Sequence, residues 1–344
     1  MPRIAVDATA VAPAGKGHAR SQRKLVESLA ALGRFELVAY VRTREAAALL
    51  PDVEAVVLGP GKAIVWEQVG MRRALRAADL LVTLAERLPV GAERRVVVWL
   101  FELPTHRIAE NRRAGAGWYQ RGSDALTSLI WRHSLTRAAR VVAGSKATAA
   151  ELGLDVPVVY PGLDDAFGPG PGRGGRYVFH LASSDPRDNT ATVLDAFARA
   201  ETDAELIVGG ALGTLEPELR ARAGNRVCFL GRVSDDELVT LYRGASVYVD
   251  ATLYEGFGYQ VLEAMACGAP VVASSLTSIP EVVGDAGLLC DPHDADAIAF
   301  ALQRVLGDAD EAGAMRERGF AQAARFTWAR TGERFGAILD DVLA

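Results

Sequence analysis

A strand, a glycine loop and a helix follow one another near residue 250, and this unit constrains the fold more than any other segment. Residues 246–250 (Ser-Val-Tyr-Val-Asp) are a short apolar run that indicates a buried strand. Gly-Phe-Gly at 256–258 comes next, and an apolar helical pattern then runs to Gly-Ala-Pro at 268–270, where a helix-ending glycine precedes a proline. Val-Val-Ala at 271–273 indicates the next strand. Such a unit is typical of a parallel sheet covered by helices.

Two carboxylates flank this glycine loop, Glu255 on its N-terminal side and Glu263 in the helix that follows. The start of a helix favours anions, because free backbone N–H groups and the helix dipole both face it. A glutamate in the first turns of that helix can accept two hydrogen bonds at once, which suits a ribose diol. The alternative is a plain strand–turn–helix whose glycines serve packing and whose glutamates are solvated.

The same alternation of short apolar runs and helical patterns extends over the whole chain. In the first half we expect strands at 4–6, 37–41, 55–58, 80–84, 96–100 and 141–143, and helices at 18–32, 66–76 and 124–137. In the second half we expect strands at 177–181, 205–208, 227–230, 247–250, 271–273 and 287–290, and helices at 190–200, 235–242, 259–267, 294–305 and 327–343. A Gly/Pro-rich segment at 168–175 separates the halves and indicates a linker. The pattern predicts an α/β protein of two doubly wound, parallel-sheet, Rossmann-like domains, with ligands bound in a central cleft at the carboxyl edges of both sheets.

Composition restricts the class of protein further. A chain of 344 residues with half of them hydrophobic suits two globular domains. The net charge of −5 argues against a nucleic-acid binder. The three cysteines lack metal-ligand spacing and indicate reduced thiols of a cytoplasmic protein. The N-terminus leads directly into a strand, without a signal peptide, and no apolar run reaches the length of a membrane span. We expect no metal and no cofactor.

Positive charge is concentrated between residues 87 and 140, where ten arginines stand against four acidic residues, a local balance of +6. One interpretation is a solvated arginine-rich surface. The other is a basic patch for a phosphorylated, lipid-linked or nucleotide-like acceptor, or for peripheral contact with the inner face of an anionic membrane.

The segment from Leu253 to Ala273 resembles the donor-binding motif of the retaining glycosyltransferases of family 4, whose pattern is Glu, seven residues, Glu, with Gly-Phe-Gly after the first. The resemblance implies the GT-B fold. It divides the chain into an acceptor-side domain at 1–167, the linker at 168–175, a nucleotide-sugar-binding domain at 176–326, and a helix at 327–344 that packs back on the first domain. It also implies that Glu255 contacts the transferred sugar as a catalytic residue and that Glu263 binds the donor ribose. The donor-binding set would include Gly256, Phe257 and Gly258.

A second matching segment, residues 180–189, follows the first strand of the second domain and resembles the family loop that places cations on the donor diphosphate. Arg187 and Asn189 match the pattern, which makes Arg187 a catalytic candidate and Asn189 a donor-binding one. Asp188 stands where the family usually has lysine. Because a carboxylate would repel a diphosphate, we expect Asp188 to point away and to cap the helix that starts at Thr190.

Weaker resemblances concern three more segments. Gly17 and Arg20 match the N-terminal glycine loop that faces the donor sugar, although this pattern can also be a turn that only starts a helix. Arg232 lies in a loop similar to the one that holds the donor base, and Ser234 or Asp235 in that loop indicates a helix N-cap. The sugar-binding histidine of many relatives is missing at its usual place; His106, a few residues further along that loop, is the catalytic candidate to replace it, or else a structural or exposed histidine.

Together these features predict an enzyme, a retaining hexosyltransferase-type glycosyltransferase. Its donor would be a GDP- or UDP-sugar and its acceptor a hydroxyl group, in polysaccharide, glycolipid or natural-product biosynthesis. The main alternative is a catalytically silent GT-B protein that binds a nucleotide sugar as a partner subunit. A dinucleotide-dependent dehydrogenase is a third, weaker alternative, because neither half has a complete glycine fingerprint.

Overall fold

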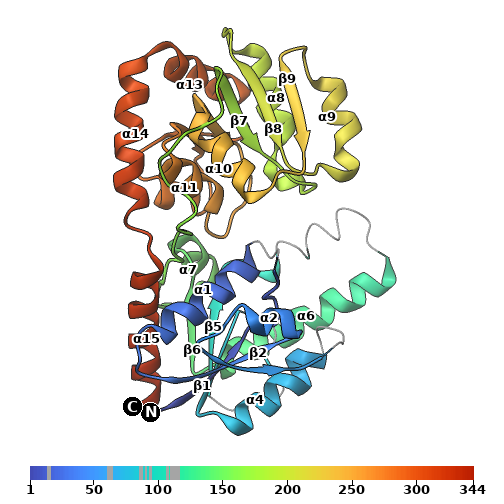
Figure 1. Cartoon of the computed structure of the whole chain (residues 1–344). Coiled ribbons are helices and arrows are strands. Elements are labelled where there is room, and N and C mark those ends of the chain that lie inside the picture. The colour runs from blue at the N-terminus through green and yellow to red at the C-terminus, as the bar shows by residue number, and fades with distance from the viewer. Residues whose placement is uncertain are drawn as a thin grey trace. The chain divides into compact units, whose positions relative to one another are not determined.

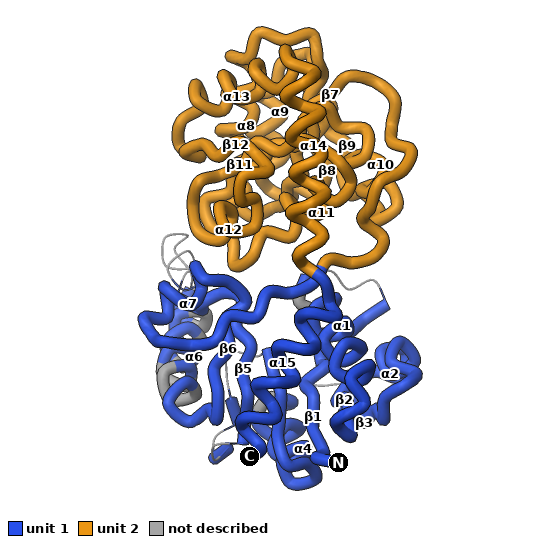
Figure 2. Tube along the Cα trace, turned by 90° about the vertical axis from the view of Figure 1, so that its left-hand side faces the viewer, with its two compact units in different colours: residues 1–162, 327–344 blue, residues 163–326 orange. Residues whose placement is uncertain are grey.

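The computed structural model describes residues 1–13, 17–59, 65–84, 88–89, 91–92, 95–105, 108 and 117–344. The chain forms two compact units, one of residues 1–162 and 327–344 and one of residues 163–326 (Figure 2). In the described residues each unit is built around a six-stranded sheet whose neighbouring strands are parallel.

Unit 1 is a doubly wound sheet with the strand order β3-β2-β1-β4-β5-β6. Its strands are β1 (Arg3–Asp7), β2 (Glu36–Val41), β3 (Glu54–Val57), β4 (Leu80–Thr83), β5 (Val96–Leu100) and β6 (Arg140–Ala143). Its helices are α1 (His18–Ala30), α2 (Arg44–Ala48), η1 (Trp66–Gly70), α4 (Met71–Ala77), α6 (Trp118–Arg137), α7 (Lys146–Leu152) and α15 (Trp328–Leu343) (Figure 1). The order of the strands reverses between β1 and β4, which makes the carboxyl ends of these two strands the place where such sheets bind ligands.

The last helix, α15, belongs to unit 1, where it packs against α1 (Figure 1). Two glycines allow the close approach: a Cβ at Gly332 would lie 2.8 Å from the carbonyl oxygen of Ser28, and one at Gly336 would lie 2.6 Å from Leu32 Cδ1. Arg34 and Asp340 add an ion pair of 2.9 Å across this contact.

Unit 2 has the order β12-β11-β10-β7-β8-β9. Its strands are β7 (Tyr177–Leu181), β8 (Glu205–Gly209), β9 (Val227–Gly231), β10 (Val247–Asp250), β11 (Val271–Ser274) and β12 (Leu288–Cys290). Its helices are η2 (Pro186–Asp188), α8 (Thr190–Arg199), η3 (Gly213–Leu215), α9 (Glu216–Arg222), α10 (Asp235–Gly244), α11 (Tyr259–Cys267), α12 (Ile279–Val283), α13 (Ala295–Gly307) and α14 (Ala309–Ala323). Here the order reverses between β10 and β7, so the carboxyl ends of these strands are the expected ligand site of unit 2.

The Gly/Pro segment 168–175, which the sequence predicts to join the halves, lies within unit 2 and packs against α10. Arg173 N donates to Thr240 O at 3.1 Å, and Arg243 Nε donates to Gly168 O at 2.7 Å. A Cβ at Gly172 would lie 2.3 Å from Gly244 N, so the glycine serves a close packing contact. The division between the units falls at 162/163, and the chain returns to unit 1 at 326/327.

Several elements differ from their sequence-based expectation. The single helix predicted at 66–76 is a five-residue π-helical segment, η1, followed by α4. No helix was expected at 309–323, where α14 lies. Glycines at 313 and 319 weaken its intrinsic preference for helix, and α14 is stabilised by packing against α11. In the described part of the chain, no helix is both long and apolar enough to cross a membrane.

Candidate functional site

Two loops that the sequence singled out meet at the point in unit 2 where the strand order reverses. One follows β7 and contains Arg187 and Asn189; the other follows β10 and leads to Glu255. Leu253 N donates to Arg187 O at 2.8 Å, and Asn189 Nδ2 donates to Ala251 O at 3.0 Å. The two loops therefore form one surface at the carboxyl edge of the sheet.

The loop after β7 is shaped by its own polar side chains. Asp185 accepts from Arg187 N at 2.9 Å and starts the short helix η2, in which Pro186 occupies the first turn. Asn189 then adopts a left-handed conformation (φ 54°), which asparagine tolerates better than most residues. Its amide also donates to Pro292 O at 2.8 Å, which ties the loop to the segment after β12.

The guanidinium of Arg187 is held in place by Asp185 and Tyr254. Nε and Nη2 donate to the same oxygen of Asp185, at 2.9 and 2.7 Å, and the guanidinium carbon lies 5.7 Å from the centre of the Tyr254 ring. Burial acts to raise the pKa of Asp185, but the hydrogen bonds and charge of Arg187 outweigh it, and the pKa lies below its usual range. Arg187 is thus ordered, with part of its charge balanced by a neighbouring carboxylate.

Asp188 closes the loop back onto its own beginning: its Oδ2 accepts from the hydroxyl of Ser183 at 2.7 Å and from Ser183 N. The expectation that Asp188 caps α8 is wrong, because the N-cap position is Asn189, which makes no side-chain cap hydrogen bond. The carboxylate of Asp188 accepts from the hydroxyl and the backbone N–H of Ser183 instead of from the first turn of α8.

The backbone of Glu255 is fixed by two residues that the sequence did not reveal. Glu255 N and Thr277 Oγ1 form a hydrogen bond of 3.1 Å, and Ser278 Oγ donates to Glu255 O at 2.8 Å. Thr277 has φ 53°, a rare conformation for a β-branched residue. Strained backbone of this kind is concentrated at functional sites. No sequence signal marks Thr277 or Ser278, because they act through the fold from the turn after β11.

The glycine loop itself is tightly packed. Phe257 is buried, and its ring lies edge-on to Tyr259 at 5.1 Å and to Phe326 at 5.7 Å. Gly256 is also buried. Gly258 is the N-cap of α11 with φ 98°, and a Cβ there would lie 2.7 Å from Ile279 Cδ1, so only glycine fits. Helix α11 starts directly after this loop, as predicted. The backbone N–H groups of its first turn therefore face the loop.

Glu263 lies on the buried side of α11, with only 6% of its surface exposed. Burial raises the pKa of the Tyr242 hydroxyl well above its usual range, and the charge of Glu263 adds to this rise. Burial likewise raises the pKa of Cys267 to about 11, with Glu263 again contributing. Glu263 therefore lies near α10 as well as behind the glycine loop, and its contact with a donor ribose stays a prediction.

A buried polar network lies beneath the two loops. His180 Nδ1 lies 3.0 Å from Val249 O and Nε2 lies 3.0 Å from Thr190 Oγ1, which links β7, β10 and the start of α8. Burial lowers the pKa of His180. Asp250 Oδ1 accepts from Thr252 N at 2.9 Å. Burial raises the pKa of Asp250 to about 6.

The same network also holds the backbone of Arg187 in place. Thr252 Oγ1 donates to Arg187 O at 3.2 Å. Tyr248 donates to Gln260 Oε1 at 3.0 Å, from β10 to the first turn of α11. Sequence reasoning missed Asp250 and Thr252, although an aspartate at the end of a buried strand is a signal that could have identified the first.

Arg232 is exposed and directly follows β9, the strand at the edge of the sheet. Gly210 N donates to Gly231 O at 2.7 Å, which joins the ends of β8 and β9 beside it. The N-cap prediction in this loop is confirmed: Ser234 and Glu237 form a capping box at the start of α10. The structure brings Arg232 to the same sheet edge as Arg187, and its donor contact stays a prediction.

In unit 1, Gly17 is the N-cap of α1 with φ 54°, and Arg20 lies in the first turn of the helix. His106 lies outside the described residues. The sequence missed Asp7, which is buried at the end of β1 where the strand order reverses. Its carboxylate accepts from Thr9 Oγ1 at 2.7 Å and from Thr83 Oγ1 at 2.8 Å, which ties the loop after β1 to β4.

In the parts of the chain that the structure describes, no three His, Cys, Asp or Glu side chains are grouped so as to hold a metal ion. Independence from metals and cofactors stays a prediction.

Most of unit 2 matches the model of a known protein family. The model of the family described as "Glycosyl transferases group 1" matches residues 175–308, which include β7 to β12 and both site loops. Unit 2 contains a group 1 glycosyl transferase domain. Arg187, Asn189, Glu255 and Glu263 all lie within the matched part of this domain.

The chain is similar to curated relatives over part of its length. It is 38% identical to the O-antigen chain mannosyltransferase B of Escherichia coli over 161 residues, which cover 44% of this chain and 42% of the relative. It is 33% identical to the D-inositol 3-phosphate glycosyltransferase of Mycolicibacterium smegmatis over 201 residues, which cover 51% of this chain and 45% of that protein. The matches thus span less than half the length of these relatives.

The fold extends over both units. A solved structure of sucrose-phosphate synthase from Thermosynechococcus elongatus superimposes with a TM-score of 0.77, at 21% identity, and the match covers 99% of each chain. The chain therefore has the GT-B fold of two Rossmann-like domains, as the resemblance of its motifs implied.

Proposed function

We propose that this chain is a retaining glycosyltransferase that moves a sugar from a nucleotide-diphosphate sugar to a hydroxyl acceptor. The observation that carries the proposal is the meeting of the Arg187 loop and the Glu255 loop, joined by the 2.8 Å hydrogen bond from Leu253 N to Arg187 O, inside a group 1 domain. This junction lies where open α/β sheets bind their ligands.

The residues of the junction suit the charge that such a reaction develops. When the bond between the sugar and the diphosphate breaks, negative charge grows on the leaving phosphate, and fixed cations and N–H dipoles stabilise it. Arg187 supplies the cation, and the backbone around Phe257 and Gly258 at the start of α11 supplies the dipoles. The acceptor oxygen attacks the anomeric carbon on the face that the diphosphate leaves, and the hydroxyl proton passes to the departing phosphate oxygen as the new bond forms. No protein nucleophile is required.

The other site residues would orient the donor. In this proposal Glu255 accepts hydrogen bonds from the hydroxyls of the transferred sugar, and its fixed backbone sets its position. Glu263 binds the ribose, while Gly256, Asn189 and Arg232 shape the rest of the donor site. Gly17 and Arg20 contribute from the loop after β1, and His106 remains the candidate for a sugar contact from unit 1.

The donor is a GDP- or UDP-sugar, and the acceptor belongs to polysaccharide, glycolipid or natural-product biosynthesis. Similarity to a protein named for mannosyl transfer onto an O-antigen chain makes a mannosyl donor the first to test. Similarity to a D-inositol 3-phosphate glycosyltransferase supports a phosphorylated acceptor.

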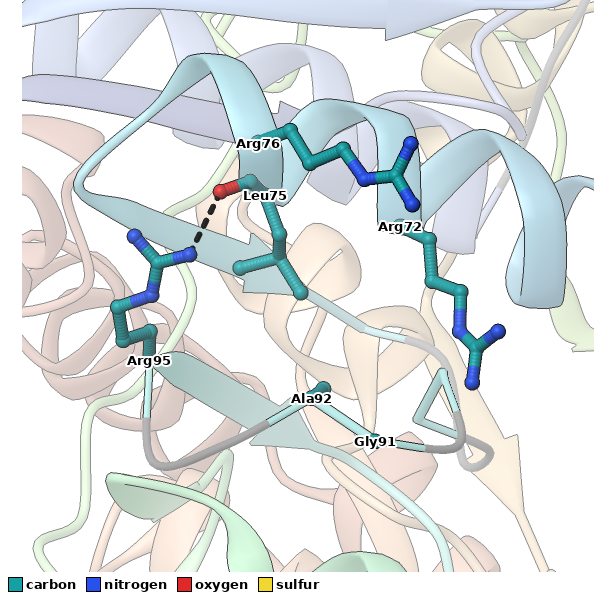
Figure 3. A pocket seen from close by; sticks show the side chains of 6 residues that line it. All are labelled: Arg72, Leu75, Arg76, Gly91, Ala92 and Arg95. Carbon is teal, nitrogen blue, oxygen red and sulfur yellow. Dashed lines mark hydrogen bonds between the residues drawn. The ribbon is translucent and has the colours of Figure 1, made fainter.

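We also propose that the basic region 87–140 contacts such a phosphorylated or lipid-linked acceptor, or the inner face of a membrane at its periphery. Some of the described arginines have partners inside unit 1. Arg140 pairs with Asp341, and Arg95 donates to Leu75 O (Figure 3). These two are therefore partly committed to the fold.

One observation favours a second candidate function, binding of a nucleotide sugar without transfer. Asp185 balances part of the Arg187 charge, and Asp188 stands where the family usually has lysine. A catalytically silent partner subunit needs less positive charge at the diphosphate than an enzyme does.

Release of nucleoside diphosphate separates the two functions. The full chain is incubated with GDP-mannose, GDP-fucose, UDP-glucose and UDP-galactose, each with and without mannoside and inositol 3-phosphate acceptors. We expect slow release from one donor alone and faster release with an acceptor. Micromolar binding of one donor by calorimetry, with no release under any condition, would instead establish the binding-only function.

A further inference from the structure

The carboxyl group of Asp250 connects the two segments that form the proposed donor site. Asp250 ends β10 and is buried, with 4% of its surface exposed. Its Oδ1 accepts from Thr252 N at 2.9 Å, and Thr252 Oγ1 donates to Arg187 O at 3.2 Å. Its Oδ2 lies 3.3 Å from the hydroxyl oxygen of Tyr248, which in turn lies 3.0 Å from Gln260 Oε1. One oxygen therefore leads to the Arg187 loop, and the other leads to the first turn of α11.

The contacts on the Oδ2 side place a proton on Asp250. The hydroxyl of Tyr248 has one proton, and it donates this proton to Gln260 Oε1, the closer of its two neighbours. The contact between Tyr248 and Asp250 is then a hydrogen bond only if the acid donates to the hydroxyl oxygen. An ionised Asp250 would take the proton of Tyr248, and Gln260 could stay linked only by turning its amide to donate instead. The protonated acid satisfies all three groups in the arrangement that the structure has.

The surroundings of Asp250 favour its protonated form at mildly acidic pH. Burial raises the pKa of Asp250 to about 6, against the opposing effect of its hydrogen bonds with Thr252 N and Tyr248. Other titratable groups that face Asp250, Tyr248 or the adjacent strand come from four elements: Asp188 of η2, Tyr242 of α10, Glu263 of α11 and His180 of β7. Two of these are carboxyl groups, one is a phenol, and burial lowers the pKa of the histidine. These four groups therefore add no positive charge that would favour ionisation, and the guanidinium of Arg187 is directed at Asp185.

We infer that Asp250 is a positioning residue of the donor site, which holds the Arg187 loop through Thr252 and the start of α11 through Tyr248. The inference rests on the proposed function, and it adds a residue that touches neither donor nor acceptor. The two connections lead to different parts of the proposed chemistry. Arg187 stabilises the leaving diphosphate, whereas the start of α11 orients the groups that bind the nucleotide. Loss of the first connection should mainly lower turnover, and loss of the second should mainly weaken nucleotide binding.

Four variants separate the connections. Thr252→Val removes the hydroxyl that donates to Arg187 O, and Tyr248→Phe removes the hydroxyl that donates to Gln260. Asp250→Leu removes both connections at once. Asp250→Asn keeps them, because an amide has the donor and acceptor pattern of the protonated acid. Tyr177→Phe is the matched control, since it removes another buried tyrosine hydroxyl of the same sheet, which donates to Leu241 O at 2.7 Å.

Hydrogen exchange of the free chain, followed by mass spectrometry at pH 5.5, tests the connections without any donor. We expect Thr252→Val to speed exchange in segment 182–190 and Tyr248→Phe to speed it in segment 257–264. Each change should be about 2- to 10-fold, as for loss of one neutral hydrogen bond. Asp250→Leu should speed exchange in both segments, while Asp250→Asn and the control should exchange as the wild type does. Circular dichroism verifies folding, and the two single-connection variants decide the matter if Asp250→Leu does not fold.

Kinetics and calorimetry then link the connections to the proposed function. At pH 5.5, Thr252→Val should mainly lower kcat, and Tyr248→Phe should mainly raise the donor KM and weaken the binding of GDP or UDP, each by about 2- to 10-fold. Asp250→Asn should match the wild type at pH 5.5 and exceed it at pH 8, where the wild-type acid is ionised. A merely structural role of Asp250 would not divide kcat from KM in this way.

Three results would overturn the inference. They are equal loosening of both segments by each single-connection variant, wild-type exchange in both of these variants, and an Asp250→Asn variant as impaired at pH 5.5 as Asp250→Leu. Failure of the proposed function would look different. In that case the wild type would neither bind a nucleotide nor release one from any donor, while the exchange rates would still show whether Asp250 holds the two segments.

Discussion

Arg187 donates two hydrogen bonds to one carboxylate oxygen of Asp185, from Nε at 2.9 Å and from Nη2 at 2.7 Å. The pair lies beside Tyr254, the residue before Glu255, and so connects the loop after β7 to the loop after β10. In the proposed reaction this contact orders the cation that faces the leaving diphosphate, and it also reduces the charge that the cation presents.

Arg187→Ala is expected to lower turnover by about two to three orders of magnitude, as for loss of a preorganised group that stabilises charge in the transition state. Asp188→Lys, which introduces the usual family residue, should partly restore the turnover of Arg187→Ala if position 188 faces the diphosphate. Asp188→Asn is the control, because it removes the charge without adding a cation. Steady-state kinetics of the single and double variants measure this, and near-normal turnover of Arg187→Ala would exclude the residue from the mechanism.

Glu263→Ala should weaken the binding of nucleoside diphosphate by about 10- to 150-fold, because a hydrogen bond to a charged group is worth about 1.5–3 kcal/mol. Glu255→Ala should leave that affinity unchanged and lower turnover, since its proposed partner is the transferred sugar. Calorimetry with GDP and UDP measures both variants. Wild-type affinity in Glu263→Ala would disprove the ribose assignment.

Gly258→Ala should destabilise unit 2 and weaken donor binding. The left-handed backbone at φ 98° costs about 1–2 kcal/mol for a residue with a Cβ, and the new atom would lie 2.7 Å from Ile279 Cδ1. Ile279→Val removes that atom, so the double variant should recover the steric part of the loss and keep the backbone part. Thermal unfolding measures both, with Gly224→Ala, which meets no atom within 4 Å, as the control. Full recovery of thermal stability in the double variant would show that the left-handed backbone conformation itself costs no free energy.

The stability of the chain should depend on pH through Asp250. Burial raises its pKa to about 6 in the folded state, against about 3.9 in an unfolded chain. The folded state therefore holds this proton more tightly, and the stability that it contributes is present at low pH and is lost as pH rises through 6. Ionisation of the buried carboxyl costs up to about 3 kcal/mol, from a shift of about two units.

Asp250→Asn removes this ionisation, so the stability of the variant relative to the wild type should increase between pH 4.5 and 7.5. Thermal or denaturant unfolding at the two pH values measures the difference. Asp285→Asn, at an exposed position, is the control and should show little change with pH. A constant difference for Asp250→Asn across this range would contradict the raised pKa.

Transferase activity should be retained in excess chelator, because cations and backbone dipoles are proposed to stabilise the leaving diphosphate. The assay is release of nucleoside diphosphate before and after dialysis against EDTA, with the nucleotide affinity of the dialysed protein as the control for folding. Loss of activity that Mg²⁺ or Mn²⁺ restores would refute this prediction.

The sequence by itself determined the local units of this protein. The strands 177–181 and 247–250 and the helix 259–267 have the predicted bounds, because apolar runs, glycines and Gly-Ala-Pro act on neighbouring residues. The parallel α/β class followed from their alternation, and the glycine loop with its two glutamates indicated the family. Such features depend on short-range sterics and on the period of burial, which a single sequence displays.

Only the tertiary structure decided which groups hold the site in place. Asp188 binds Ser183 instead of capping α8, Arg187 pairs with Asp185, and Thr277 fixes the backbone of Glu255 from a turn more than twenty residues away. The Gly/Pro segment 168–175 packs against α10, although its composition is that of a linker. In each case several partners compete for one group, and the fold decides which of them is nearest. The spacing of residues along the chain does not show this.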